Sequence, residues 1–76
     1  MPSRIVVDPH ILSGKPVVKG TRISVELVLE KLAANPDLKE LLKAYPRLTL
    51  ADIKDCIKYA KALVSSELVF PHEISA

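Results

Sequence analysis

The sequence predicts a mostly α-helical fold in which an N-terminal β-hairpin is followed by three helices. Two short β-branched segments flank a turn-forming stretch, three apolar stripes at helical spacing follow, and prolines separate the stripes. The 76 residues form one domain overall, and a chain of this size buries only ~60% of the surface that its unfolded form exposes. A partner subunit would therefore stabilise it.

The hairpin is expected within residues 1–22. Segments 4–8 and 16–19 are rich in β-branched residues, and the Pro, Ser and Gly residues between them are typical of a turn. A lone two-stranded hairpin is only marginally stable in water, so we expect it to complete a sheet with a second subunit, in a homodimer or a higher even oligomer. The residues expected at this dimer interface are Ile5, Val6, Val7, Val17 and Val18.

The segment 23–65 is expected to hold three helices. The first begins after Ser24, which can cap it, and ends at Asn35-Pro36 because a residue before proline disfavours the α conformation. The second runs over 37–45 and ends before Pro46.

The third helix is expected to run from Thr49 to about Ser65. Thr49 and Asp52 resemble a capping box, with Asp in place of the usual Glu or Gln. One face should be buried against the other elements, and the opposite face should be exposed. The residues expected on the buried face are Ile53, Cys56, Ile57, Ala60, Leu63 and Val64.

Residues that could support catalysis or hold a metal are few. Two histidines and one cysteine do not provide the three or four converging ligands of a zinc site. The stretch 14–22 lacks the Gly-x4-Gly-Lys-Ser/Thr order of a phosphate-binding loop. Asp8, His10 and Ser13 are residue types of a hydrolytic triad, but they share one expected turn, where no separate scaffold aligns them. We therefore expect no enzymatic activity, no catalytic residue, no metal and no cofactor.

The second and third expected helices, with the break 46–48 between them, have the lengths of a helix-turn-helix pair. Lysines at i, i+4 and i+7 of the third helix form a line that could follow DNA phosphates. Alternatively, these lysines only solvate the helix, and two aspartates near its start would oppose DNA. The expected DNA-binding residues are Arg47, Thr49, Lys54, Lys58 and Lys61. If this helix is not the contact surface, the basic hairpin face with Lys15, Lys19 and Arg22 is the candidate.

Residues 66–76 form an expected C-terminal tail without helical periodicity. Its apolar residues Leu68, Val69 and Phe70 either pack on the chain's own dimer or bind a groove of a partner. The start of the chain has no signal-peptide pattern, no apolar run approaches the ~20 residues of a membrane span, and a single cysteine forms no intramolecular disulfide. We therefore expect a cytoplasmic protein with no membrane contact.

Four motifs stand out in the sequence. They are Gly14-Lys-Pro-Val-Val-Lys-Gly-Thr-Arg-Ile-Ser-Val25, Ala44-Tyr-Pro-Arg-Leu-Thr49, Asp52-Ile and Tyr59-Ala60. Together they resemble the DUF433 family over about residues 4–63. The resemblance implies a homeodomain-like or winged-helix-like fold of three helices, preceded by a β-hairpin that mediates dimerisation. Two positions depart from the family pattern: Ser13-Gly14 replaces a frequent glycine pair, and Asn35-Pro36 replaces a frequent glycine after the first helix. Both replacements suit turns.

The family resemblance also implies a function. It is that of an antitoxin of a type II toxin–antitoxin pair, related to antitoxins that neutralise PIN-domain ribonucleases. Such a dimer would bind double-stranded operator DNA and regulate its own operon, while Leu68, Val69 and Phe70 would bind the PIN-like ribonuclease toxin. The alternative is a protein-interaction and dimerisation module that does not bind DNA.

Overall fold

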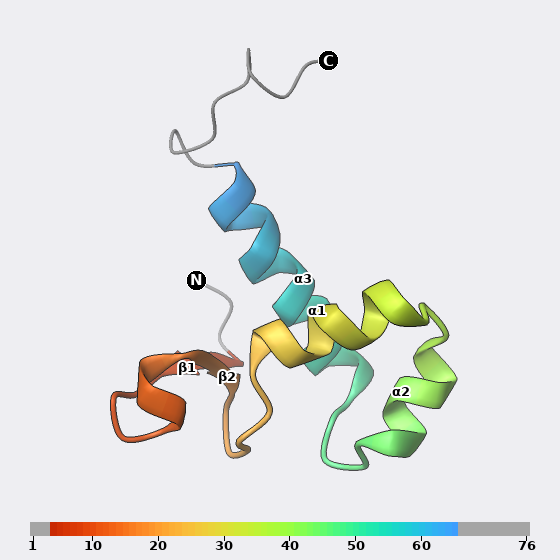
Figure 1. The fold of residues 1–76 in the computed structure, drawn as a ribbon, viewed down its shortest axis with the longest axis horizontal. Helices are drawn as coiled ribbons and strands as arrows, with labels where there is room; N and C mark the ends of the chain where they lie inside the picture. The colour runs from red at the N-terminus through yellow and green to blue at the C-terminus, as the bar shows by residue number, and fades with distance from the viewer. Residues whose placement is uncertain (1–3, 66–76) are drawn as a thin grey trace.

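The computed structural model describes residues 4–65. Its elements are, in order, β1 (Ile5–Val7), a short 3-10 turn η1 (Leu12–Gly14), β2 (Pro16–Val18), α1 (Val25–Ala34), α2 (Leu38–Ala44) and α3 (Leu50–Val64). The hairpin and α1 contact α3, and α2 packs on α1, while the later turns of α3 extend beyond these elements (Figure 1). The predicted hairpin followed by a three-helix, helix-turn-helix bundle is confirmed.

The hairpin is a two-stranded antiparallel sheet with a strained connection. The opposed pairs are Ile5 with Val18, Val6 with Val17, and Val7 with Pro16. In the connection, Leu12, Ser13 and Gly14 have φ angles of 49°, 57° and 84°. The left-handed conformation is open to glycine but costs other residues roughly 1–2 kcal/mol. The connection therefore stores strain at Leu12 and Ser13, whereas Gly14 adopts its angle freely.

Side chains cap the start of all three helices within residues 4–65. The Ser24 hydroxyl accepts a hydrogen bond from the backbone N–H of Leu27 at 2.9 Å. The Asp37 carboxylate accepts one from the N–H of Lys39 at 3.0 Å. At α3, the Thr49 hydroxyl accepts from the N–H of Asp52 at 3.1 Å, and the Asp52 carboxylate accepts from the N–H of Thr49 at 2.9 Å. The predicted Ser24 cap and the predicted capping box are thus confirmed.

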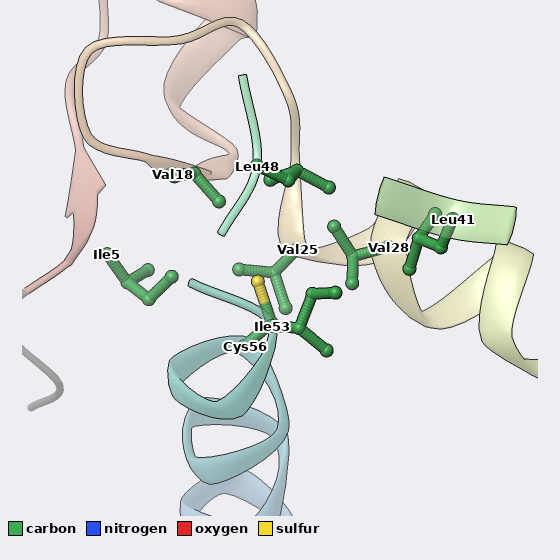
Figure 2. Close-up of a cluster of buried hydrophobic side chains, with 8 residues drawn as sticks. All are labelled: Ile5, Val18, Val25, Val28, Leu41, Leu48, Ile53 and Cys56. Carbon is green, nitrogen blue, oxygen red and sulfur yellow. The ribbon is translucent and has the colours of Figure 1, made fainter. Parts of the chain in front are cut away.

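The hydrophobic core lies where the hairpin, α1 and the first half of α3 meet, and α2 closes one side (Figure 2). Its buried residues are Ile5, Val18, Val25, Val28, Leu41, Leu48, Ile53 and Cys56. Ile53 and Cys56 of α3 point toward Val25 and Val28 of α1 in Figure 2. Because Ile5, Val17 and Val18 are also buried, the hairpin is an integral part of this core.

The second half of α3 departs from the expected burial. Ile57, Leu63 and Val64 are 47%, 58% and 66% exposed, and Ala60 is half-buried, so the prediction that these four residues are buried is wrong. The reason is the length of the neighbouring elements: α3 has 15 residues, whereas α1 has 10 and each strand has 3. Helical periodicity identifies an apolar face, but it does not say how far along the helix that face is covered.

No helix within residues 4–65 has both the length and the apolar character that crossing a bilayer requires.

Candidate nucleic-acid interface

The outer face of α3 carries an exposed line of three lysines, Lys54, Lys58 and Lys61. Consecutive helical residues are rotated by about 100°, so these lysines fall within an arc of roughly 60° on the side away from the buried Ile53 and Cys56. Among residues 4–65, none of them has a salt-bridge or hydrogen-bond partner for its ammonium group. In this part of the chain, no carboxylate therefore pairs with the three positive charges of the line.

The two aspartates of α3 are turned toward Arg4, next to β1. The backbone N–H of Arg4 donates to Asp55 Oδ2 at 3.2 Å, and Arg4 Nε lies 3.9 Å from Asp52 Oδ1. The Asp52 side chain is only 13% exposed and also accepts from the N–H of Thr49. These interactions occupy the carboxylates that the sequence suggested would oppose DNA.

Thr49 and Arg47, the other two predicted DNA contacts, hold the fold together at the turn between α2 and α3. Thr49 caps α3, and Arg47 Nη2 donates to the carbonyl oxygen of Gly20 at 2.6 Å. Both residues remain exposed. Since a guanidinium has five N–H donors, Arg47 keeps further donors for an external group.

The structure brings one part of the alternative basic face next to the helix-turn-helix. Arg22, in the loop between β2 and α1, lines a hollow of about 410 Å³ together with Arg47. By contrast, the ammonium of Lys15 is paired with Glu26 at 2.9 Å. From the sequence, Arg22 belongs to the expected hairpin face and Arg47 to the expected helix-turn-helix surface. In the sequence, Gly20-Thr-Arg22 indicates only a turn, and it does not indicate that this turn lies near Arg47.

The hairpin residues predicted to mediate dimerisation are placed unequally. Ile5, Val17 and Val18 are buried in the chain's own core, Val6 is half-buried, and Val7 is 51% exposed. In the sheet of residues 4–65, β1 pairs with β2 alone, so its other edge has no neighbouring strand. A dimer through the hairpin would therefore use this backbone edge and Val7. Dimerisation stays a prediction.

A second, apolar groove lies between α1 and α3, on another part of the surface. It has a volume of about 250 Å³, and its lining residues are Pro16, Val25, Glu26, Leu29, Tyr59, Ala60 and Leu63. It adjoins the exposed end of α3. The residues predicted to bind a toxin, Leu68, Val69 and Phe70, lie outside the described residues.

Cys56 has the properties of a core residue. Its side chain is fully buried, and this burial raises the pKa of the thiol from 9.0 to about 11, with further contributions from the negative charges of Asp52 and Asp55. The reactive thiolate is thus strongly disfavoured at neutral pH. Over residues 4–65, no three His, Cys, Asp or Glu side chains come together in a way that could hold a metal ion.

Comparison with known proteins identifies the family. The family model described as "Protein of unknown function (DUF433)" matches residues 5–60, a span that includes both strands, α1, α2 and most of α3. Uncharacterized protein y4eO of Sinorhizobium fredii (strain NBRC 101917 / NGR234) is 38% identical over 58 residues, which are 76% of this chain and 26% of that protein. The chain thus spans about a quarter of the length of this curated relative. No solved structure matches. The family match covers most of the chain, which therefore belongs to the DUF433 family.

Proposed function

We propose that this chain is a DNA-binding antitoxin, which contacts the operator of its own operon through α3. The observation that carries the proposal is the line of Lys54, Lys58 and Lys61, which is exposed and has no carboxylate partner within residues 4–65. In a helix-turn-helix, the second helix is the one that enters the major groove. Here that helix is α3.

The proposed contact is mainly electrostatic. Lysine ammonium groups neutralise phosphates and release counterions, which makes the affinity strongly dependent on salt. The exposed face of α3 has no Arg, Asn or Gln, the residues that most often form bidentate contacts with bases. We therefore expect only moderate sequence preference.

The experiment is electrophoretic retardation of the DNA upstream of the gene, measured at several salt concentrations. Replacing Lys54, Lys58 and Lys61 with Ala should weaken binding and reduce the slope of log K against log salt by ~0.9 for each phosphate that is no longer neutralised. A matched control replaces the exposed Lys31, Lys39 and Lys43 of α1 and α2, which changes the net charge by the same amount. If both variants bind like the parent, α3 is not the DNA-contacting surface.

The antitoxin role adds a second partner, a PIN-like ribonuclease whose metal-binding centre is built from carboxylates. Residues 62–76 contain no Lys or Arg, so this segment offers no lysine or arginine side chain to occupy that centre. We propose that inhibition instead uses apolar contacts, with Phe70 as the anchor. Truncation after Ser65 should abolish rescue of cells that express the toxin, while DNA retardation is kept. Rescue by the truncated chain would place the inhibitory surface on residues 1–65.

A protein-interaction module without DNA binding is the second candidate function. It is favoured by two observations: an apolar groove lies between α1 and α3, and Ile57 and Val64 expose apolar side chains on α3. Exposed apolar surface marks contact sites. Ile57→Gln removes the apolar side chain without adding a charge beside Lys61, and it should therefore weaken such an interaction without changing DNA retardation. Both functions are binding functions, and we propose no enzymatic activity for this chain.

A further inference from the structure

Two loops that are distant in sequence form one basic hollow. The loop 19–23 follows β2, the turn 45–49 joins α2 to α3, and both lie at the same end of the molecule in Figure 1. The residues that line the hollow are Ile11, Gly20, Thr21, Arg22 and Arg47. No carboxylate is among them, so the hollow has two guanidinium groups that no lining residue from the described part of the chain, residues 4–65, balances with a negative charge.

The loop that carries Arg22 is held in one conformation by its neighbours. Gly20 adopts a φ of 81°, which glycine tolerates, and its carbonyl accepts the hydrogen bond from Arg47. The Thr21 hydroxyl donates to the carbonyl of Val18 at 2.8 Å and accepts from the N–H of Ile23 at 2.9 Å. These bonds fix the backbone on both sides of Arg22.

The Arg22 side chain does not take part in fixing this loop. It is exposed, and its side chain forms neither a hydrogen bond nor an ion pair with another residue of the segment 4–65. Arg47 uses one Nη2 donor on Gly20, which anchors its guanidinium at the hollow while other donors stay available. The hollow thus combines one anchored and one unpaired guanidinium.

We propose that this hollow binds a phosphate group, with the guanidinium groups of Arg22 and Arg47 as its ligands. The planar fork of a guanidinium matches two phosphate oxygens, and such charge-assisted bonds are stronger than those between neutral groups. Thr21 contributes backbone shape only, since its hydroxyl proton is already donated to Val18. Ile11 supplies an apolar wall for the sugar or base next to the phosphate.

The same chemistry could come from a phosphodiester of DNA or from a phosphate monoester such as a nucleotide. The first source rests on the proposed DNA binding and adds a contact outside α3. The second does not depend on it. The experiment therefore has two arms, and both use the full chain and two variants of equal charge change. The variants are Arg22→Gln and, as the control, Lys39→Gln on the exposed surface of α2.

In the first arm, inorganic phosphate and adenosine monophosphate are titrated at constant ionic strength, and amide chemical shifts are followed by NMR. Saturating shifts are expected at Gly20, Thr21 and Arg22 in the parent and in Lys39→Gln, and at least a threefold weaker affinity in Arg22→Gln. In the second arm, the salt slope for a non-operator duplex is measured. Arg22→Gln should lower it by ~0.9 if a backbone phosphate is bound.

Each result has a definite meaning. A change in the first arm alone assigns the hollow to small phosphate esters, and a change in the second assigns it to the DNA backbone. If Arg22→Gln behaves like Lys39→Gln in both arms, the phosphate site does not exist. If the parent binds no duplex at all, the proposed DNA-binding function fails, while the first arm still decides whether the hollow binds phosphate.

Discussion

Replacing Ser13 with Gly should stabilise the protein. Ser13 has a φ of 57°, in the left-handed region that costs a non-glycine residue roughly 1–2 kcal/mol. Glycine removes this cost, but its greater conformational entropy in the unfolded chain lowers the free energy of unfolding by about 0.4–1 kcal/mol. The difference between the midpoints of these two ranges gives an expected net gain of about 0.8 kcal/mol in the free energy of unfolding. With an unfolding entropy of ~2.1 cal/mol/K per residue over 76 residues, the melting temperature should rise by about 5 °C.

The neighbouring glycine gives the opposite test of the same reasoning. A Cβ added at Gly14 would meet only the Cα of Pro9 at 3.8 Å, an ordinary contact, so Gly14→Ala should lose stability through its φ of 84° alone. The assay is thermal unfolding followed by circular dichroism at one fixed protein concentration, because assembly makes melting temperatures depend on concentration. An unchanged or lower melting temperature for Ser13→Gly, or an unchanged one for Gly14→Ala, would refute the assignment of strain to these angles.

Three other variants or conditions test different parts of the fold. Cys56 should resist alkylation at pH 8 until the chain unfolds. Because folding raises the pKa of its thiol from 9.0 to about 11, the free energy of unfolding should decrease as the pH rises from 9 to 11, by up to about 1.4 kcal/mol per pH unit. Cys56→Ala should remove this pH dependence. Thr49→Ala should lower the free energy of unfolding by about 1 kcal/mol in urea titrations, whereas Thr49→Ser keeps the capping hydroxyl and should lose much less. In sedimentation experiments, Val7→Lys should weaken a dimer that forms through the hairpin and Ile57→Glu should not; the reverse pattern would place the interface on α3.

Local chemistry explains why the helix boundaries could be predicted. The expected second helix, 37–45, is observed as Leu38–Ala44, and the expected third, Thr49 to about Ser65, as Leu50–Val64. In both cases the capping side chain and the helix it caps are adjacent in sequence, so the signal is short-ranged. The exposure of the lysine line follows in the same way from the helical period.

Features that depend on tertiary arrangement were not accessible from the sequence. Arg47 and Gly20 are 27 residues apart, and Arg4 and Asp55 are 51 residues apart, yet these contacts determine which charges the candidate interface presents. No periodicity or spacing rule reports such distant pairs. The exposure of Ile57 could not be predicted either, because it depends on where the neighbouring strands and α1 end.

The uneven burial of α3 also has a consequence for local unfolding. At 1.5 Å per residue the helix is about 22 Å long, but its fully buried residues, Ile53 and Cys56, both lie in its first half. Opening of the last two turns breaks few core contacts, so amide hydrogens there should exchange with solvent by local fraying, while those near Ile53 await global unfolding. The stability of the fold therefore depends mainly on the first half of this helix. Substitutions near Val64 should accordingly leave the global stability nearly unchanged.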